Sequence, residues 1–250
     1  IAIVGQPNVG KSTLLNYFVG TKLSITSRKA QTTRYQLLGI HSENDTQYIF
    51  VDTPGYQLRH LNMLNRGLNK TVQQALQDVD VILFLIEPGV LDETDKKILN
   101  MIPEETPIVL AINKVDLMKD KAKLLGYIKE LDGIQRFEAI VPTSVKKANN
   151  LQPLMLALKS FLPEQAFIFP EDELTDKNEK FLSAEIVREK VFRLTGQELP
   201  YSIAVEIEKF EYVEGIRRIF AAIIVDRESH KPMIIGKKGA RLKEISMSSR

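Results

Sequence analysis

The sequence predicts an α/β chain of two domains, the first built on a mostly parallel sheet and the second with an α+β fold. Apolar runs of strand length alternate with helical patterns as far as about residue 161. The polar motifs of this part follow its strands, as expected at the carboxyl edge of an open α/β sheet. After about residue 170 the pattern changes to helix, strand, strand, helix, which predicts the second domain.

Composition supports a globular chain of this size. The 250 residues exceed one typical domain, and 44% apolar with 26% charged residues is enough for a sizeable core. No apolar run approaches the roughly 20 residues of a membrane span. The absence of Cys excludes disulfides and thiolate metal sites and fits a reducing compartment. A net charge of +2 means that any nucleic-acid site must be a local patch. Because Ile1 already lies in a predicted strand, a preceding segment is left open.

The residues Gly5–Ser12 read G-x-x-x-x-G-K-S between the apolar run Ile1–Val4 and a helical pattern that begins at Lys11. In this context the glycines let successive N–H groups converge on phosphate oxygens, next to the positive end of the helix. Lys11 can reach the outer phosphates and the Ser12 hydroxyl can bind Mg²⁺. The alternative is a chance glycine turn. The predicted phosphate-binding residues here are Gly5, Gln6, Pro7, Asn8, Val9, Gly10, Lys11, Ser12 and Thr13.

The stretch Ser24–Arg34 is polar and has no hydrophobic periodicity, so it is predicted to be a loop. Its distance from the glycine loop allows it to fold over the phosphates. Thr33 is our first choice for a second Mg²⁺ ligand, and Thr32 the second choice, in a loop that is held only while a γ-phosphate is present. Taken alone, this composition also describes a solvated connection.

A hairpin is predicted from Tyr35–His41 and Gln47–Val51 around a polar turn at Ser42–Asp45. It leads into Asp-Thr-Pro-Gly at residues 52–55. The Asp52 carboxylate can hold Mg²⁺ through water and the Gly55 N–H can meet the γ-phosphate, although this tetrapeptide alone is an ordinary turn. Phosphate contacts are therefore also assigned to Asp52, Thr53, Pro54 and Gly55, and Mg²⁺ to Ser12, Thr33 and Asp52.

The next elements alternate helix and strand. We predict helices at about 61–77, 95–101, 121–131 and 151–161, buried strands at 81–86 and 108–112, and a further strand at 139–142. The second of these strands ends in Asn-Lys-Val-Asp, where Asp116 can accept from the N1–H and exocyclic amine of guanine, donors that adenine does not present. Residues 143–146 follow the last strand and offer backbone N–H groups to the guanine oxygen. The predicted guanine-binding residues are Asn113, Lys114, Asp116, Ser144, Val145 and Lys146.

Together the motifs GQPNVGKS, QTTR, DTPG, NKVD and the final S-x-K loop resemble a translation-factor-class GTPase over about 165 residues. The stretches SITSRKAQTTR, FPEDELTD at 169–176 and ELPYS at 198–202 are similar to the Era family, Era/TrmE-type small GTPases with a C-terminal KH domain. The resemblance implies a P-loop NTPase (Ras-like) domain at residues 1–165, a linker at 166–176 and an RNA-binding KH domain at 177–250. It implies GTP and GDP as ligands, Mg²⁺ as cofactor, and action on 16S rRNA in maturation of the small ribosomal subunit. Val145 departs from the Ala more usual in such GTPases.

Catalysis is assigned to Lys11, Asn8 and Gly55. In Ras-like proteins a Gln that orients the attacking water directly follows the glycine of this motif, but here Tyr56 holds that position and Gln57 comes one residue late. Hydrolysis should therefore depend on the glycine loop, Mg²⁺ and positioning, and its intrinsic rate should be slow. Asn8 resembles the residue with which some P-loop GTPases hold K⁺ against the phosphates, so K⁺ is left open as a second ion.

The second domain is expected to contain a helix at about 176–194 and strands at 202–210 and 217–226. Ile-Ile-Gly-Lys-Lys-Gly then precedes a helix that begins at Ala240, the pattern of a type II KH domain whose glycine loop binds about four nucleotides. Such a domain needs a further helix and strand, so it is expected to be incomplete at Arg250. The predicted RNA-binding residues are Ile235, Gly236, Lys237, Lys238, Gly239, Arg241 and Lys243. The alternative for this lysine-rich segment is a solvated basic surface.

Two other classes of function were weighed. A nucleotide-gated RNA-binding adaptor with little hydrolysis would differ in GTP turnover, and a metabolic P-loop kinase is disfavoured by Asn113–Asp116 and by the lack of an Arg-rich lid. A monomer in the cytoplasm is expected. The resemblance leaves peripheral association with the inner face of the cell membrane open, and an organellar relative as well.

Overall fold

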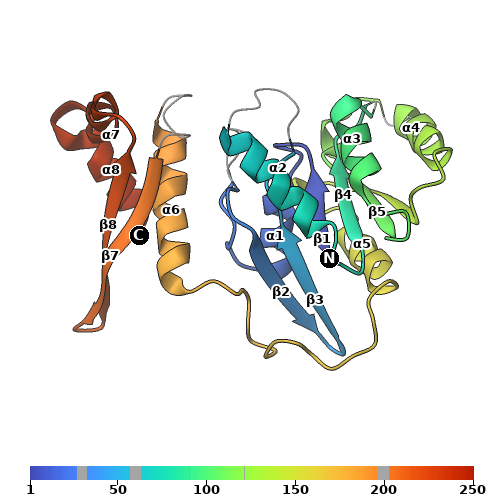
Figure 1. Ribbon diagram of the computed structural model, residues 1–250, viewed down its shortest axis with the longest axis horizontal. Helices are drawn as coiled ribbons and strands as arrows, with labels where there is room; N and C mark the ends of the chain where they lie inside the picture. Colours follow the sequence, from blue (N-terminus) through green and yellow to red (C-terminus); the bar gives the residue numbers. More distant parts are fainter. Residues whose placement is uncertain (27–32, 57–62, 90, 121, 196–202) are drawn as a thin grey trace. The chain divides into compact units, whose positions relative to one another are not determined.

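The computed structural model describes residues 1–26, 33–56, 63–89, 91–120, 122–195 and 203–250. The predictions for Thr32, Gln57 and the run 198–202 lie outside these residues. The chain divides into two compact units, Ile1–Ser24 with Thr33–Asp176 and Ile25–Thr32 with Lys177–Arg250. Figure 1 shows the sheet and helices of the first unit, and a long helix with a two-stranded hairpin in the second.

A six-stranded sheet in the order β2-β3-β1-β4-β5-β6 forms the first unit. Its strands are β1 (Ala2–Gly5), β2 (Leu37–Glu43), β3 (Thr46–Asp52), β4 (Ile82–Ile86), β5 (Ile108–Ile112) and β6 (Ala139–Pro142). Only β2 runs antiparallel to its neighbour, and the other four pairings are parallel. The predicted mostly parallel sheet is therefore confirmed, and the carboxyl ends of β1, β3, β4, β5 and β6 lie at one edge.

Both faces of the central strands are buried, which explains why they read as unbroken apolar runs. Alternate residues such as Val4, Phe84 and Leu110 join a core that also contains side chains of α2 (Met63–Ala75), α3 (Glu93–Met101) and α4 (Ala122–Asp132). The intervening residues are equally inaccessible on the other face. There, α1 (Lys11–Val19) contacts β1 and β3, and α5 (Leu151–Lys159) contacts β5 and β6.

Helix α3 begins two residues earlier than the sequence pattern indicated. The carboxylate of Asp92 accepts from the amides of Thr94 and Asp95 at 2.7 and 3.0 Å, and Asp95 in turn accepts from the amide of Asp92. This capping box satisfies N–H groups that the first turn leaves unpaired, so the helix starts directly after Asp92. The β2–β3 turn is likewise shorter than predicted, because pairing continues to Glu43 opposite Thr46.

Residues 168–176 contact the β2–β3 hairpin, first at Gln47 of β3 and then at the free edge of β2. The side-chain oxygen of Gln47 accepts from the amides of Ile168 and Phe169 at 3.0 Å each, and its nitrogen donates to the Phe169 carbonyl at 2.9 Å. Further along, the amide of Ile40 donates to the Leu174 carbonyl at 2.9 Å. The segment therefore covers backbone groups that an edge strand would otherwise expose.

The second unit packs one long helix against a hairpin and two short helices. Its elements are α6 (Glu179–Leu194), β7 (Ile203–Val213), β8 (Ile216–Val225), α7 (Lys231–Ile235) and α8 (Ala240–Ser248). Asn178 caps α6 by accepting from the amide of Phe181 at 2.9 Å, so this helix begins later than the predicted residue 176. A small core joins α6, β7, α7 and α8, with Val191, Phe192, Ile203, Ile234 and Ile245 buried. No helix among the described residues combines the length and apolar character that crossing a membrane requires.

Replacing Gln47 with alanine should release residues 168–169 from β3. Gln47→Ala removes three hydrogen bonds to the backbone of residues 168–169, and we expect the free energy of unfolding to fall by about 1–3 kcal/mol. Amide exchange at Ile168 and Phe169 should rise in parallel, measured by hydrogen exchange with mass spectrometry. The exposed Gln152 of α5 provides the matched control, Gln152→Ala. Unchanged exchange in Gln47→Ala would show that the segment is held by other contacts.

Candidate functional site

The loop between β1 and α1 is shaped by close approach to its neighbours. Gly10 has φ +111°, and a Cβ added there would lie 2.3 Å from the Asn113 side-chain nitrogen. Only glycine fits this position, because a side chain would displace Asn113 and strain the backbone. Asn113 follows β5, so this contact links the glycine loop to the second motif at the sheet edge.

Lys11 folds back over the loop that precedes it. Its Nζ donates to the carbonyls of Gly5 and Gln6 at 3.0 and 2.8 Å, and the residue is only 6% exposed. Burial lowers the pKa of Lys11 to about 8, and the nearby charge of Asp52 opposes this shift. The amine is thus enclosed in a loop of backbone groups, at the place where the sequence predicts phosphates.

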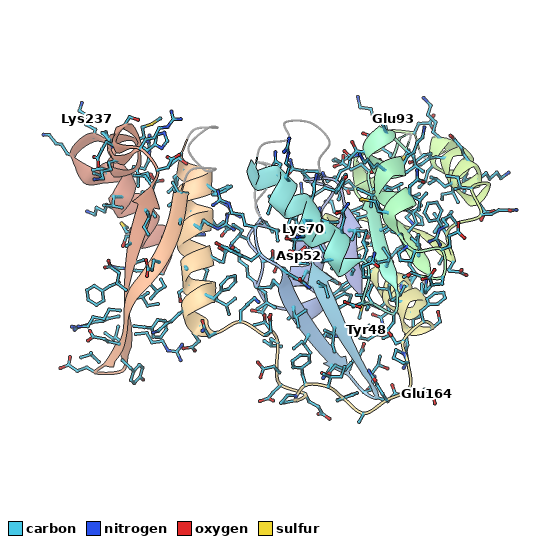
Figure 2. The ribbon with its side chains drawn as sticks, viewed as in Figure 1. Tyr48, Asp52, Lys70, Glu93, Glu164 and Lys237 are labelled. Carbon is cyan, nitrogen blue, oxygen red and sulfur yellow. The ribbon has the colours of Figure 1, made fainter. Side chains whose placement is uncertain are left out.

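Ser12, Thr33 and Asp52 converge although they come from three separate segments (Figure 2 labels Asp52). The Ser12 hydroxyl donates to Asp52 Oδ2 at 2.9 Å and lies 2.9 Å from the Thr33 hydroxyl. Thr33 is itself 3.4 Å from the same carboxylate oxygen. Burial raises the pKa of Asp52, while hydrogen bonds from Ser24, Ser12 and Thr33 and the charge of Lys11 oppose the rise.

This cluster fits Mg²⁺. Neighbouring oxygen ligands in an octahedral Mg²⁺ shell at about 2.0–2.1 Å lie roughly 2.8–3.0 Å apart, and the Ser12 and Thr33 oxygens are separated by 2.9 Å. The second carboxylate oxygen, Asp52 Oδ1, is buried without a hydrogen-bond partner among the described residues. Such an unpaired acceptor is costly unless a ligand meets it. Two hydroxyls and one carboxylate suit an ion whose shell is completed by phosphate oxygens and water.

Sequence reasoning missed two residues of this cluster. Ser24 donates its hydroxyl to Asp52 Oδ2 at 2.7 Å and is 6% exposed. Asn16 holds the backbone of Ser24 through its side-chain amide. Asn16 lies four residues after Ser12 and therefore on the same face of α1, a spacing that could have revealed it. Ser24 carries no comparable signal, since it is one of several hydroxyl residues in a polar loop.

The residues after Asp52 are tied to β1. Thr53 donates its hydroxyl to the Ile3 carbonyl at 2.7 Å, and the Tyr56 amide lies 3.4 Å from the Gly5 carbonyl. Tyr56 is buried in the apolar core beside α2 and α3, so its side chain is unavailable to orient a water molecule. Pro54 is buried and Gly55 half-buried in this turn.

Asn113 joins three loops. Its side-chain nitrogen donates to the Val9 carbonyl at 2.8 Å, and its oxygen accepts from the Val145 amide at 3.1 Å. Lys114 extends beside the glycine loop, where its Nζ donates to the Asn8 carbonyl at 2.7 Å and pairs with Glu87 at 2.5 Å. Glu87, directly after β4, is a further residue that the sequence did not indicate.

Asp116 and Ser144 meet at the end of the sheet. The Ser144 hydroxyl donates to Asp116 Oδ1 at 2.5 Å, and the Asp116 side chain is otherwise exposed to solvent. Val145 is buried beside them. The structure therefore brings Asn113, Asp116, Ser144 and Val145 together, whereas the side chains of Thr13 and Lys146 are exposed and do not join the cluster.

The second unit carries a glycine loop between α7 and α8. Gly236 has φ +72°, and a Cβ there would lie 2.8 Å from the Arg241 Cβ, so a side chain would clash and strain the backbone. Arg241 donates to the Met233 carbonyl, which ties α8 to α7. Lys237, Lys238 and Lys243 are exposed, as is Ile235 at 44% (Figure 2 labels Lys237 at this end of the unit). Backbone and ammonium groups are thus accessible on one loop.

The first unit is a P-loop GTPase domain, because it combines a glycine loop with a buried lysine, a Mg²⁺-compatible hydroxyl cluster and a guanine-type Asn-Lys-x-Asp loop. A KH-type unit follows it. Family comparison agrees, since residues 1–114 match the 50S ribosome-binding GTPase family and residues 198–250 match the KH domain. The chain belongs to the GTPase Era family. It is 48% identical to GTPase Era of Nitrosomonas eutropha and 47% identical to that of Chromobacterium violaceum, over 100% of this chain and 84% of each relative.

Solved structures give the same result. Era in complex with MgGDPNP and nucleotides 1506–1542 of 16S ribosomal RNA superimposes with a TM-score of 0.93, at 43% identity over 100% of this chain and 85% of that one. A variant of Aquifex aeolicus Era bound to GDP and tetrafluoroaluminate has the same TM-score and identity, over 100% and 86%. These matches confirm the predicted fold class.

Asp116 should set the choice of base. Asp116→Ala should weaken GDP binding by about 2–4 kcal/mol, because it leaves guanine donors unpaired, and Asp116→Asn should shift preference toward xanthine nucleotides. Displacement of a fluorescent nucleotide by GDP, XDP and ADP measures both effects. Asp120→Ala, on an exposed neighbouring carboxylate, is the control. Equal affinity of the unaltered protein for GTP and ATP would contradict the assignment.

Proposed function

We propose that this chain binds and hydrolyses GTP with Mg²⁺ in its first unit and binds 16S rRNA through its second, acting in assembly of the small ribosomal subunit. The observation that carries the proposal is the convergence of Lys11, Ser12, Thr33 and Asp52 within one buried network. The Era structure that contains MgGDPNP and 16S ribosomal RNA supports the same pair of ligands. The division into residues 1–165, 166–176 and 177–250 remains part of this proposal.

In the proposed complex the β- and γ-phosphates lie on the glycine loop, Gly5–Thr13, at the amino end of α1. Lys11 moves from the carbonyls of Gly5 and Gln6 to phosphate oxygens, and its lowered pKa reflects the burial that these anions would compensate. Ser12 and Thr33 would hold Mg²⁺ directly and Asp52 through water. The ion would supply positive charge beside the transferring phosphoryl group.

Guanine is read by Asp116, with Asn113 and Lys114 bracing the pocket. The Ser144–Asp116 hydrogen bond at 2.5 Å orients the carboxylate, and the Val145 amide bound to Asn113 fixes the last loop. A hydrogen-bonding site of this kind rejects adenine because its polar groups would be left unpaired. Backbone N–H groups of residues 144–146 face the guanine oxygen in this proposal.

Hydrolysis depends on positioning and electrostatics, without a side chain that orients the attacking water. Lys11, the Gly55 amide and Asn8 act on the γ-phosphate, and the rate is slow. The burial of Tyr56 supports this reading. In a finer proposal, Asn8 holds a K⁺ ion against the phosphates.

The Ser24–Arg34 loop links the nucleotide to RNA binding. Ser24 and Thr33 belong to the first unit, whereas Ile25–Thr32 are grouped with the second. Within the second unit, Arg193 of α6 donates to the Thr26 carbonyl at 3.1 Å, and the Thr26 amide approaches Glu189 at 3.4 Å. GTP with Mg²⁺ orders this loop through Thr33, and the change in the loop alters how the KH unit is presented to rRNA.

The RNA site lies on the loop Ile235–Gly239 and the start of α8. Its lysines neutralise phosphates, and its glycines allow backbone approach to about four nucleotides of a single strand. A cytoplasmic site of action, peripheral contact with the inner face of the cell membrane and a monomeric state remain predictions from the family resemblance.

GTP turnover tests the first half of the proposal. Gln57→Ala should reduce the hydrolysis rate less than about tenfold, under ~1.4 kcal/mol of barrier, because the positioning groups are elsewhere. Lys11→Ala should reduce it by more than about a hundredfold. Single-turnover hydrolysis of radiolabelled GTP measures both. A hundredfold loss in Gln57→Ala would show that this residue orients the water, and no Mg²⁺-dependent turnover in the unaltered chain would overturn the proposed activity.

Salt dependence tests the second half. Binding of a short single-stranded RNA resembling the end of small-subunit rRNA should weaken with salt, with a log–log slope of about −0.7 per phosphate neutralised. Replacing Lys237 and Lys238 with alanine should flatten that slope by roughly one to two units. Fluorescence anisotropy gives the slopes. The control removes two exposed lysines of the first unit, Lys97 and Lys123, for the same change in net charge. Equal slopes for both double variants would place the RNA elsewhere.

A further inference from the structure

The carboxylate of Asp52 is asymmetric in its contacts. Among the residues that the structure describes, three hydroxyl groups reach it, and all approach one oxygen, Oδ2: Ser24 at 2.7 Å, Ser12 at 2.9 Å and Thr33 at 3.4 Å. The other oxygen, Oδ1, is buried and has no hydrogen-bond partner among the residues described. Asp52 itself is 0% exposed, so bulk solvent does not reach this oxygen.

Ser24 makes the shortest of the three contacts, and the position of its backbone is fixed. The side-chain oxygen of Asn16 accepts from the amides of Leu23 and Ser24 at 2.9 and 2.8 Å. The nitrogen of the same side chain donates to the Ser24 carbonyl at 2.7 Å. The Asn16 side chain therefore hydrogen-bonds both the amide and the carbonyl of Ser24, and it lies on the helix that also carries Ser12.

The hydroxyls of Ser12 and Thr33 are expected to bind the Mg²⁺ ion, unlike that of Ser24. Ser12 and Thr33 face one another at 2.9 Å, the separation of neighbouring Mg²⁺ ligands, so each must turn a lone pair toward the ion when it is bound. Ser24 is free of that requirement, because its hydroxyl is needed only as a donor to Oδ2. A donor that stays in place prevents the carboxylate from rotating about its Cβ–Cγ bond. Oδ1 then keeps its direction whether or not the ion is present.

Resting on the Mg²⁺-nucleotide site proposed above, we propose that Ser24, held by Asn16, is a positioning residue that fixes the orientation of the Asp52 carboxylate beside the Ser12 and Thr33 oxygens. Preorganised ligands lose less conformational freedom on binding, so the contact strengthens Mg²⁺ binding without touching the nucleotide. The pair also fixes the start of the Ser24–Arg34 loop, the same segment whose far end supplies Thr33.

The test measures the Mg²⁺ dependence of release of a fluorescent GDP analogue. Ser24→Ala should raise the Mg²⁺ concentration for half-maximal slowing of release by about three- to tenfold, the net effect of losing one typical hydrogen bond. Release in excess EDTA should stay within about twofold of the unaltered protein, because the phosphate and guanine contacts remain. Ser24→Thr, which keeps a hydroxyl, should recover at least part of the difference.

Two further variants separate positioning from stability. Asn16→Ala should shift the Mg²⁺ midpoint in the same direction, and the double variant should shift it no further than the larger single change, because both residues act through one contact. Thr195→Ala removes a buried hydroxyl bonded to the Val191 carbonyl at 2.6 Å in the second unit and should leave the midpoint unchanged. An unchanged midpoint in Ser24→Ala, an equal effect in EDTA, or full additivity with Asn16→Ala would overturn the inference. Failure of the unaltered chain to bind GDP at all would overturn the proposed function itself.

Discussion

Two opposite charges held out of water determine the rest of the nucleotide site. Lys11 and Asp52 are both buried, and the same cause acts on them in opposite directions, lowering the pKa of the amine and raising that of the carboxyl. Backbone carbonyls and hydroxyl groups offset only part of this cost, since Asp52 Oδ1 has no partner among the described residues. Phosphates and Mg²⁺ would complete the missing contacts, so ligand binding and the stability of this unit are linked.

The sheet brings the motifs to one edge, and side chains set the distances between them. Parallel strands place Asn113, Asp52 and the glycine loop at the same end, but strand spacing alone does not fix loops that extend beyond it. Asn113 supplies that link by bonding the Val9 carbonyl and the Val145 amide. The Asn113 side-chain amide therefore sets the position of the proposed base-binding loops relative to the glycine loop.

The elements and contacts differ in how far the sequence reveals them. The strand at 108–112 has the bounds that its apolar run predicted, because burial on both faces leaves an unbroken local signal. The motif Asn-Lys-x-Asp was also recognisable from the sequence, because its residues are adjacent in the chain. Ser24 and Glu87 were missed because each acts on a partner more than twenty residues away, Asp52 and Lys114, and such a pairing leaves no period or spacing in the chain. Asn16 is an intermediate case. The sequence shows its helical spacing from Ser12 but not its hydrogen bonds to the backbone of Ser24.

The polar residues of the first unit are buried and those of the second unit's glycine loop are exposed. This difference determines how strongly a single substitution affects each unit. In the first, polar groups such as Asp52 and Asn113 are buried, so removing one partner leaves another unsatisfied and costs about 1–3 kcal/mol at once. In the second, Lys237, Lys238 and Lys243 are exposed, and in the proposed RNA site each would act by releasing counterions from phosphates one at a time. Gly236 is the exception there, because its positive φ and its closeness to Arg241 make its identity a steric requirement. Substitutions should therefore abolish nucleotide binding in single steps and weaken RNA binding gradually, except at the glycine that shapes the loop.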